Sequence, residues 1–208
     1  MLATSLVLQP RSDGFSRCVQ FPLPCSLHIV ILRARRGFPH YPSQKAGFRK
    51  RLMRLTDIIS IDKIKIPLGA GTKQQAIEEL VDLLVSTGDV SDKNSALGAV
   101  LEREKTRTTG IGNGLAIPHG KSTAVGKLVM AIGRPSQEID FESVDEKPVR
   151  LIILLLSPMD MTGPHIQALA RVSRLMSIDG VRRAIERAPG AQEILKAIQD
   201  AEQAEAGA

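Results

Sequence analysis

The sequence predicts an α/β fold: a three-layer α/β/α sandwich around a mixed sheet, in a single domain that follows an N-terminal extension. The apolar run Val149–Leu156, interrupted only by Arg150, is typical of a central strand covered on both faces. Amphipathic helical patterns lie both before and after this run. Helices on both sides of a buried strand along the chain favour three layers.

The first elements of the domain follow Met53. Ile64–Leu68 has the composition of a strand, and Thr72 with Gln75 forms a capping-box pattern that predicts the start of a helix. Apolar residues then repeat at helical spacing up to Gly88, at Ile77, Leu80, Val81, Leu84 and Val85. A second helix is expected to start at Ser91, with one apolar face made of Leu97, Val100 and Leu101.

The later elements complete the sandwich. A glycine-rich segment, Gly110–Gly114, and a short apolar stretch, Leu115–Pro118, precede an expected strand at Lys127–Gly133. After Pro158 the pattern is helical, and Pro189 with Gly190 separates the last two of three expected helices, at 164–177, 180–188 and 190–203.

Residues 1–52 differ from the rest in composition. They hold nine of the 28 Lys and Arg residues but only one acidic residue, so the net charge of +6 originates there. Residues 53–208 have 21 acidic and 19 basic residues. No helical or strand period runs through 1–52. We therefore expect either that Met53 is the true start and 1–52 an upstream translation, or that 1–52 is a disordered basic arm.

Composition argues against several classes of protein. The longest unbroken apolar run, Leu151–Leu156, is far shorter than the roughly 20 residues that cross a bilayer, so we expect no membrane insertion. Two cysteines are too few for a disulfide scaffold or a four-ligand zinc site. With aromatic residues at 3% and the excess positive charge confined to 1–52, we also expect no nucleic-acid partner.

The segment Thr108–Lys121, TTGIGNGLAIPHGK, is the most informative part of the chain. The dinucleotide fingerprint G-x-G-x-x-G and the P-loop G-x-x-x-x-G-K-[ST] would both need a glycine at position 115, which is Leu115. Dinucleotide binding and P-loop hydrolysis are therefore disfavoured.

His119 is the candidate reactive residue in this segment. Pro118 fixes the backbone before it and Gly120 permits a turn after it. A neutral imidazole is a good nucleophile near pH 7, because its ordinary pKa is about 6.5. Backbone N–H groups of the glycine-rich turn and a nearby arginine could stabilise a phosphoryl group on it. The alternative is a turn histidine without chemistry.

The string TGIGNGLAIPHGK resembles the active-site signature of the type-2 (fructose/mannitol-type) enzyme IIA domain of the bacterial phosphoenolpyruvate-dependent phosphotransferase system. The resemblance covers essentially all of 53–208. It is closest to the nitrogen-regulatory branch, whose members also begin with a phrase like Leu55–Ile59. It implies a cytoplasmic phosphotransferase, without cofactor or metal, that accepts a phosphoryl group on His119 Nε2 from the phosphocarrier HPr or its nitrogen-branch paralogue.

The resemblance also implies supporting residues. His165 matches a second histidine beside the first, and Arg103 matches an arginine that supports the phosphoryl group. Taken alone, His165 could equally be a cap, an exposed residue or a core histidine, and Arg103 could belong to a solvated helix face. Thr108 could add a hydroxyl donor. The expected phosphoryl-binding loop is Thr109, Gly110, Gly112, Gly114 and Gly120.

Three roles remain open within these expectations. A regulatory enzyme IIA signals by its phosphorylation state to target proteins of nitrogen, potassium or carbon metabolism, and this branch is favoured. A sugar-specific enzyme IIA passes phosphate to an enzyme IIB, and a non-catalytic module acts through protein contacts alone. The phosphocarrier is expected to dock transiently on a shallow apolar surface made of Leu115, Ile117 and Met161.

Overall fold

The computed structural model describes residues 3–9, 17–23 and 53–206, and the chain divides into two compact units, Met1–Phe48 and Arg49–Ala208. In the first unit, β1 (Ala3–Gln9) and β2 (Arg17–Leu23) pair antiparallel. Periodicity did not predict these two strands, because neither segment alternates apolar and polar residues. The rest of the expected disordered arm lies outside the described residues.

The second unit is built on a six-stranded mixed sheet. Its strand order is β3-β7-β8-β5-β4, with β6 also pairing with β8. β8 runs antiparallel to β7 and parallel to β5 and β6, so it is the central strand. The strands are β3 (Ile64–Leu68), β4 (Gly110–Gly112), β5 (Leu115–Ala116), β6 (His119–Lys121), β7 (Val129–Pro135) and β8 (Leu151–Ser157).

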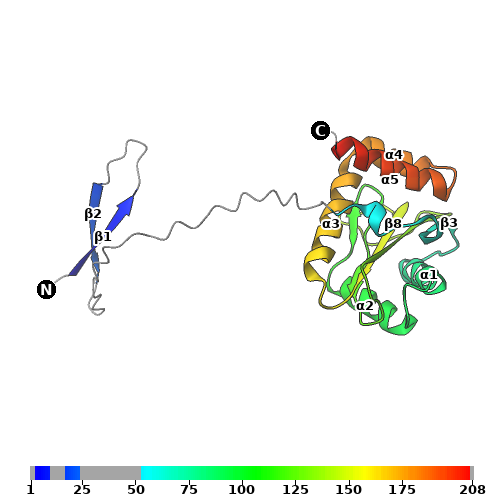
Figure 1. The fold of residues 1–208 in the computed structure, drawn as a ribbon, viewed down its shortest axis with the longest axis horizontal. Helices are drawn as coiled ribbons and strands as arrows, with labels where there is room; N and C mark the ends of the chain where they lie inside the picture. The colour runs from blue at the N-terminus through cyan, green and yellow to red at the C-terminus, as the bar shows by residue number, and fades with distance from the viewer. Residues whose placement is uncertain (1–2, 10–16, 24–52, 207–208) are drawn as a thin grey trace, which may run out of the picture. The chain divides into compact units, whose positions relative to one another are not determined.

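Helices cover both faces of this sheet (Figure 1). Two 3-10 turns, η1 (Leu55–Asp57) and η2 (Ile61–Lys63), precede β3. α1 and α2 share one hydrophobic core with the sheet, and α3, α4 and α5 share the other. The helices are α1 (Lys73–Ser86), α2 (Lys93–Thr106), α3 (Thr162–Ser177), α4 (Asp179–Arg187) and α5 (Ala191–Ala206).

The central strand explains why there are two cores. Every residue of β8 is buried, and its side chains alternate between the faces of the sheet. Ile152, Leu154 and Leu156 join the core under α1 and α2, whereas Leu151, Ile153 and Leu155 join the core under α3, α4 and α5. The predicted three-layer sandwich around a mixed sheet is confirmed.

The first helix begins as its sequence predicts. The Thr72 hydroxyl accepts a hydrogen bond from the Gln75 N–H at 3.3 Å, as a helix N-cap does. The Gln75 side chain accepts instead from the Gly71 N–H, so only half of the capping box forms.

The second helix begins later than predicted. Asp92, not Ser91, is its N-cap, and the Asp92 carboxylate accepts from the N–H groups of Asn94 and Ser95. Ser91 instead donates through its N–H and its hydroxyl to the Ala124 carbonyl. The helix therefore starts one residue later than predicted, because Asp92 rather than Ser91 caps it.

The two long strands also begin after their predicted starts, β7 at Val129 and β8 at Leu151. Val149 instead forms an isolated antiparallel bridge with Ile139. Among the described residues, no helix combines the length and the apolar character that crossing a membrane requires.

Candidate functional site

His119 is the first residue of β6, which runs beside the central strand. Its Nδ1 lies 2.8 Å from the Ile117 carbonyl oxygen. A carbonyl oxygen can only accept, so Nδ1 carries the proton and donates it. The lone pair of the neutral ring therefore resides on Nε2, and the half-buried side chain is held in one orientation.

The environment keeps His119 neutral. Burial lowers the pKa of its imidazole, and the positive charge of Arg103 lowers it further. The Ile117 carbonyl and the Glu104 carboxylate act in the opposite direction, but the net pKa lies below the ordinary value of 6.5. At neutral pH, Nε2 is consequently available as a nucleophile.

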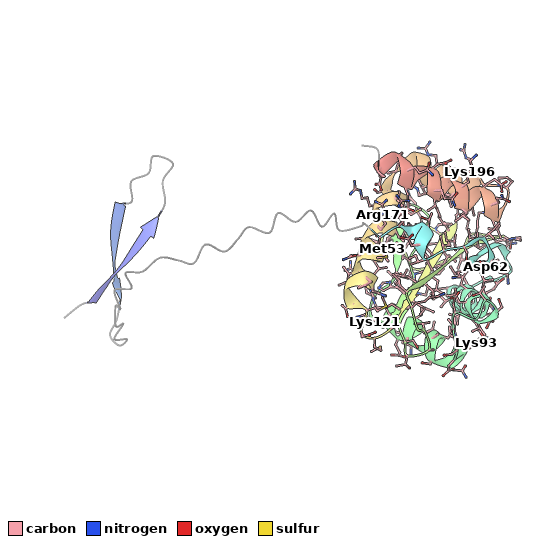
Figure 2. All side chains as sticks on the ribbon, viewed as in Figure 1. Met53, Asp62, Lys93, Lys121, Arg171 and Lys196 are labelled. Carbon is pink, nitrogen blue, oxygen red and sulfur yellow. The ribbon has the colours of Figure 1, made fainter. Side chains whose placement is uncertain are left out.

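His165 lies beside His119, buried in the first turns of α3. The ring centroids are 5.6 Å apart, with the planes inclined at 54°. Nδ1 of His165 lies 2.8 Å from the Ser157 hydroxyl at the end of β8. Burial, with smaller contributions from His119 and Lys121, lowers the pKa of His165 to about 4. Figure 2 labels Lys121, whose Nζ donates to Thr162 at the start of α3.

Arg103 lies in the last turns of α2 and is only partly exposed. One guanidinium nitrogen, Nη1, donates to the Arg107 carbonyl at 3.0 Å, which holds the side chain in place. Arg103 and His119 both line a pocket of about 310 Å³, together with Thr109, Ile111, Val144 and Leu169. The structure thus brings the three predicted residues, His119, His165 and Arg103, to one end of the sheet.

Glu104 is a residue of this site that the sequence interpretation missed. Its side chain is 5% exposed and its carboxylate accepts both the N–H and the hydroxyl of Thr109. Lys73 Nζ lies 3.4 Å from the same carboxylate. The available signal was helical spacing, because Ala96, Val100 and Glu104 are four residues apart and form the buried stripe of α2.

The backbone shape of the turn between β4 and β5 explains two glycines of the motif, Gly112 and Gly114. Gly112, Asn113 and Gly114 all have positive φ, at 96°, 56° and 75°. The Asn113 N–H donates to the Asp145 carboxylate at 2.9 Å. A Cβ on Gly114 would lie 3.0 Å from Nε of Arg150, so the two groups pack closely.

The other loop residues are also engaged in packing. A Cβ on Gly110 would overlap Ser143, and one on Gly120 would lie 3.0 Å from a backbone nitrogen of α2. The Thr108 hydroxyl donates to the Phe141 carbonyl. Both donors of Thr109 are taken by the carboxylate described above, and none of the four predicted loop glycines lines the His119 pocket. Their role in binding a phosphoryl group stays a prediction.

The predicted docking surface needs correction at two of its three residues, whereas Met161 is half-buried and its contact with a partner stays a prediction. Leu115 and Ile117 are buried, at 2% and 4% exposure, because their side chains face the core under α3. The exposed apolar side chains that line the His119 pocket are Ile111 at 46% and Val144 at 66%. These two side chains are the exposed apolar part of the pocket lining.

This arrangement is suited to group transfer onto nitrogen. A neutral imidazole with a free Nε2 can attack an electrophilic phosphorus, and a guanidinium can bind the oxygens of the transferred group. Across the described ranges, no three His, Cys, Asp or Glu side chains come together as a metal site.

Comparison with known proteins assigns the second unit to a family. Residues 57–201 match the family model described as phosphoenolpyruvate-dependent sugar phosphotransferase system, EIIA 2. The chain is 39% identical over 145 residues to a PTS system fructose-specific EIIA component of Haloferax volcanii, covering 68% of this chain and 94% of that protein. It is 35% identical over 144 residues to a nitrogen regulatory protein of Bradyrhizobium diazoefficiens, covering 68% and 92%.

The fold of the chain is also similar to that of a solved structure. The crystal structure of the nitrogen regulatory protein IIA-Ntr from Neisseria meningitidis matches with a TM-score of 0.65 and 28% identity, covering 69% of this chain and 98% of that one. The match extends the family resemblance from the sequence to the three-dimensional fold.

Proposed function

We propose, from the premise that this chain belongs to the EIIA 2 family of the phosphoenolpyruvate-dependent sugar phosphotransferase system, that it carries a phosphoryl group on His119 Nε2. Proteins of this family are phosphotransferases. The observation that carries the proposal is the 2.8 Å contact between Nδ1 and the Ile117 carbonyl, which leaves Nε2 as the free nitrogen. The donor is an HPr-like phosphocarrier that meets the chain in the cytoplasm.

The transfer step conserves atoms and charge. The lone pair of His119 Nε2 forms a bond to phosphorus while the N–P bond of the donor's phosphohistidine breaks and its electron pair returns to the donor nitrogen. The proton on Nδ1 stays in its hydrogen bond to Ile117, so no general base is needed. Because the transition state is loose, positioning and charge stabilisation supply most of the catalysis.

Arg103 and His165 support this step in different ways. The Arg103 guanidinium, which lines the pocket with His119, binds the phosphoryl oxygens as a planar donor. When the Ser157 hydroxyl donates to His165 Nδ1, the ring proton lies on Nε2, which can donate to a phosphoryl oxygen. Because the pKa of His165 is lowered to about 4, its ring stays neutral at neutral pH and carries a single N–H, which donates to the phosphoryl oxygen without transferring its proton.

For the step after phosphorylation, we favour regulation of target proteins by the phosphorylation state. The Leu55–Ile59 opening, the nitrogen regulatory relative and the IIA-Ntr structure support this branch. The second candidate is sugar-specific transfer to an enzyme IIB. The fructose-specific EIIA component, at 39% identity, favours it.

Intact-mass measurement tests the carrier function. The full chain is incubated with phosphoenolpyruvate, enzyme I and an HPr-like carrier, alongside His119→Ala and the matched control His40→Ala. We expect one acid-labile phosphoryl group on the wild type and on His40→Ala, and none on His119→Ala. The proposal fails if the wild type gains no mass from a carrier that phosphorylates another enzyme IIA, or if His119→Ala is still phosphorylated.

A second incubation separates the two branches. Phosphorylated chain is mixed with the enzyme IIB of a fructose system, and the phosphoryl group on each protein is followed by mass. Retention on this chain supports the regulatory branch, whereas rapid transfer to the enzyme IIB supports the sugar-specific one.

A further inference from the structure

A second, larger hollow lies on the other side of the β4–β5 turn, between the end of β7, the segment before β8, and α4. Its volume is about 760 Å³, within the range of about 300–1,000 Å³ in which proteins bind small molecules. Six basic side chains line it: Arg134, Lys147, Arg150, Arg182, Arg183 and Arg187. We name this hollow the basic pocket.

Part of the basic pocket is rigidly held. Arg134 Nη1 donates to two carbonyl oxygens at the end of α4, at 2.9 and 2.6 Å. Arg182 and Arg183 both pair with the carboxylate of Asp179 in the first turn of α4. Arg182 Nη1 also donates to the Met176 carbonyl, so Arg134 and Arg182 are held in place, whereas Arg183 is 61% exposed. The single Asp179 carboxylate leaves most of the positive charge in the pocket unneutralised.

The other cations face solvent. Lys147, Arg150 and Arg187 are exposed, and the Arg150 guanidinium is 3.8 Å from the carboxylate of Glu138 at its nearest approach. With Glu138 and Glu186 the only acidic residues in the lining, cations outnumber carboxylates threefold. Like charges gathered in one hollow repel each other, and an anion with several charges would relieve that repulsion.

We propose that the basic pocket binds a phosphorylated small molecule that carries at least two anionic groups. The guanidinium groups bind the phosphoryl oxygens by charge-assisted hydrogen bonds. This inference does not depend on phosphorylation of His119.

The basic pocket adjoins the candidate functional site through one turn. Asn113 and Gly114 line the basic pocket, whereas Ile111, in the adjoining strand β4, lines the pocket of His119. The Gly114 carbonyl accepts from the N–H groups of Arg150 and Leu151, so the turn is bonded to the wall of the basic pocket. Backbone amides of this turn are therefore local reporters of a bound ligand.

The test is titration of the full, unphosphorylated chain, observed by NMR at the amides of Asn113 and Gly114. The probes are a hexose bisphosphate, inorganic pyrophosphate and orthophosphate. We expect saturable shifts with the first two and binding of orthophosphate at least about tenfold weaker, because a single phosphate engages fewer of the cations.

A matched pair of variants locates the binding. Lys147→Glu/Arg187→Glu reverses two exposed charges of the basic pocket, and Arg35→Glu/Arg36→Glu makes the same change of charge within the basic segment 1–52. We expect the first pair to weaken binding at least about tenfold and the second to leave it within about twofold. Absence of saturation with both bisphosphate and pyrophosphate, equal binding of orthophosphate, or a loss caused by the second pair instead would overturn the proposal.

Discussion

Replacement of the buried Glu104 carboxylate by an amide tests how the loop before His119 is held. Both carboxylate oxygens of Glu104 accept a hydrogen bond from the Thr109 N–H, at 3.2 and 3.1 Å. In Glu104→Gln, one of these oxygens becomes an NH₂ group, which cannot accept from Thr109. The ion pair with Lys73 at 3.4 Å is also lost. Hydrogen bonds to a charged group contribute about 1.5–3 kcal/mol each, so we expect the free energy of unfolding to fall by about 3 kcal/mol.

The assay is urea unfolding followed by circular dichroism, because the chain has no tryptophan. Glu102→Gln is the matched control on the same helix: its carboxylate is 72% exposed and pairs with Lys105. We expect that change to alter the free energy of unfolding by less than about 0.5 kcal/mol. If Glu104→Gln costs no more than Glu102→Gln, the account of how this loop is anchored is wrong.

Three further predictions follow from the site and the core. Arg103→Ala should slow phosphorylation by about ten- to a hundredfold in a timed mass assay, because a charged donor to the phosphoryl group is lost, while Lys105→Ala should leave the rate unchanged. Gly133→Ala should lower the free energy of unfolding by about 1–3 kcal/mol, since its methyl group would overlap a leucine of β3, whereas Gly126→Ala has open space and should cost far less. His165 should titrate near pH 4 by NMR; because its folded pKa lies below the unfolded value of about 6.5, stability should fall as pH drops from 6.5 towards 4, and a pKa near 6.5 would refute its burial beside His119.

Strong local patterns allowed the fold to be predicted. The run Val149–Leu156, apolar except at Arg150, predicted a strand covered on both faces. The side chains of β8 alternate between two hydrophobic cores, which confirms that prediction. Ile64–Leu68 forms β3 over the predicted residues. The start of α2 differs from the prediction because Asp92 provides a better N-cap than Ser91: its carboxylate accepts hydrogen bonds from two backbone N–H groups.

The site was harder to predict, because its geometry depends on contacts between distant segments. The motif identified His119, but the role of Glu104 depends on Thr109 and on Lys73 of another helix. The surface prediction was wrong for Leu115 because β5 pairs with the central strand, which no local pattern reveals. Likewise, the basic pocket gathers arginines from β7, the segment before β8, and α4.

The central claim is that Nε2 of His119 is the phosphoryl acceptor while Nδ1 keeps its hydrogen bond to Ile117. NMR of the full chain with ¹⁵N-labelled histidine, phosphorylated through an HPr-like carrier, tests it most directly. We expect phosphorus coupling on Nε2 of His119 and a protonated Nδ1 on the same ring. Phosphorus on Nδ1 of that ring, or on His165, would contradict the account.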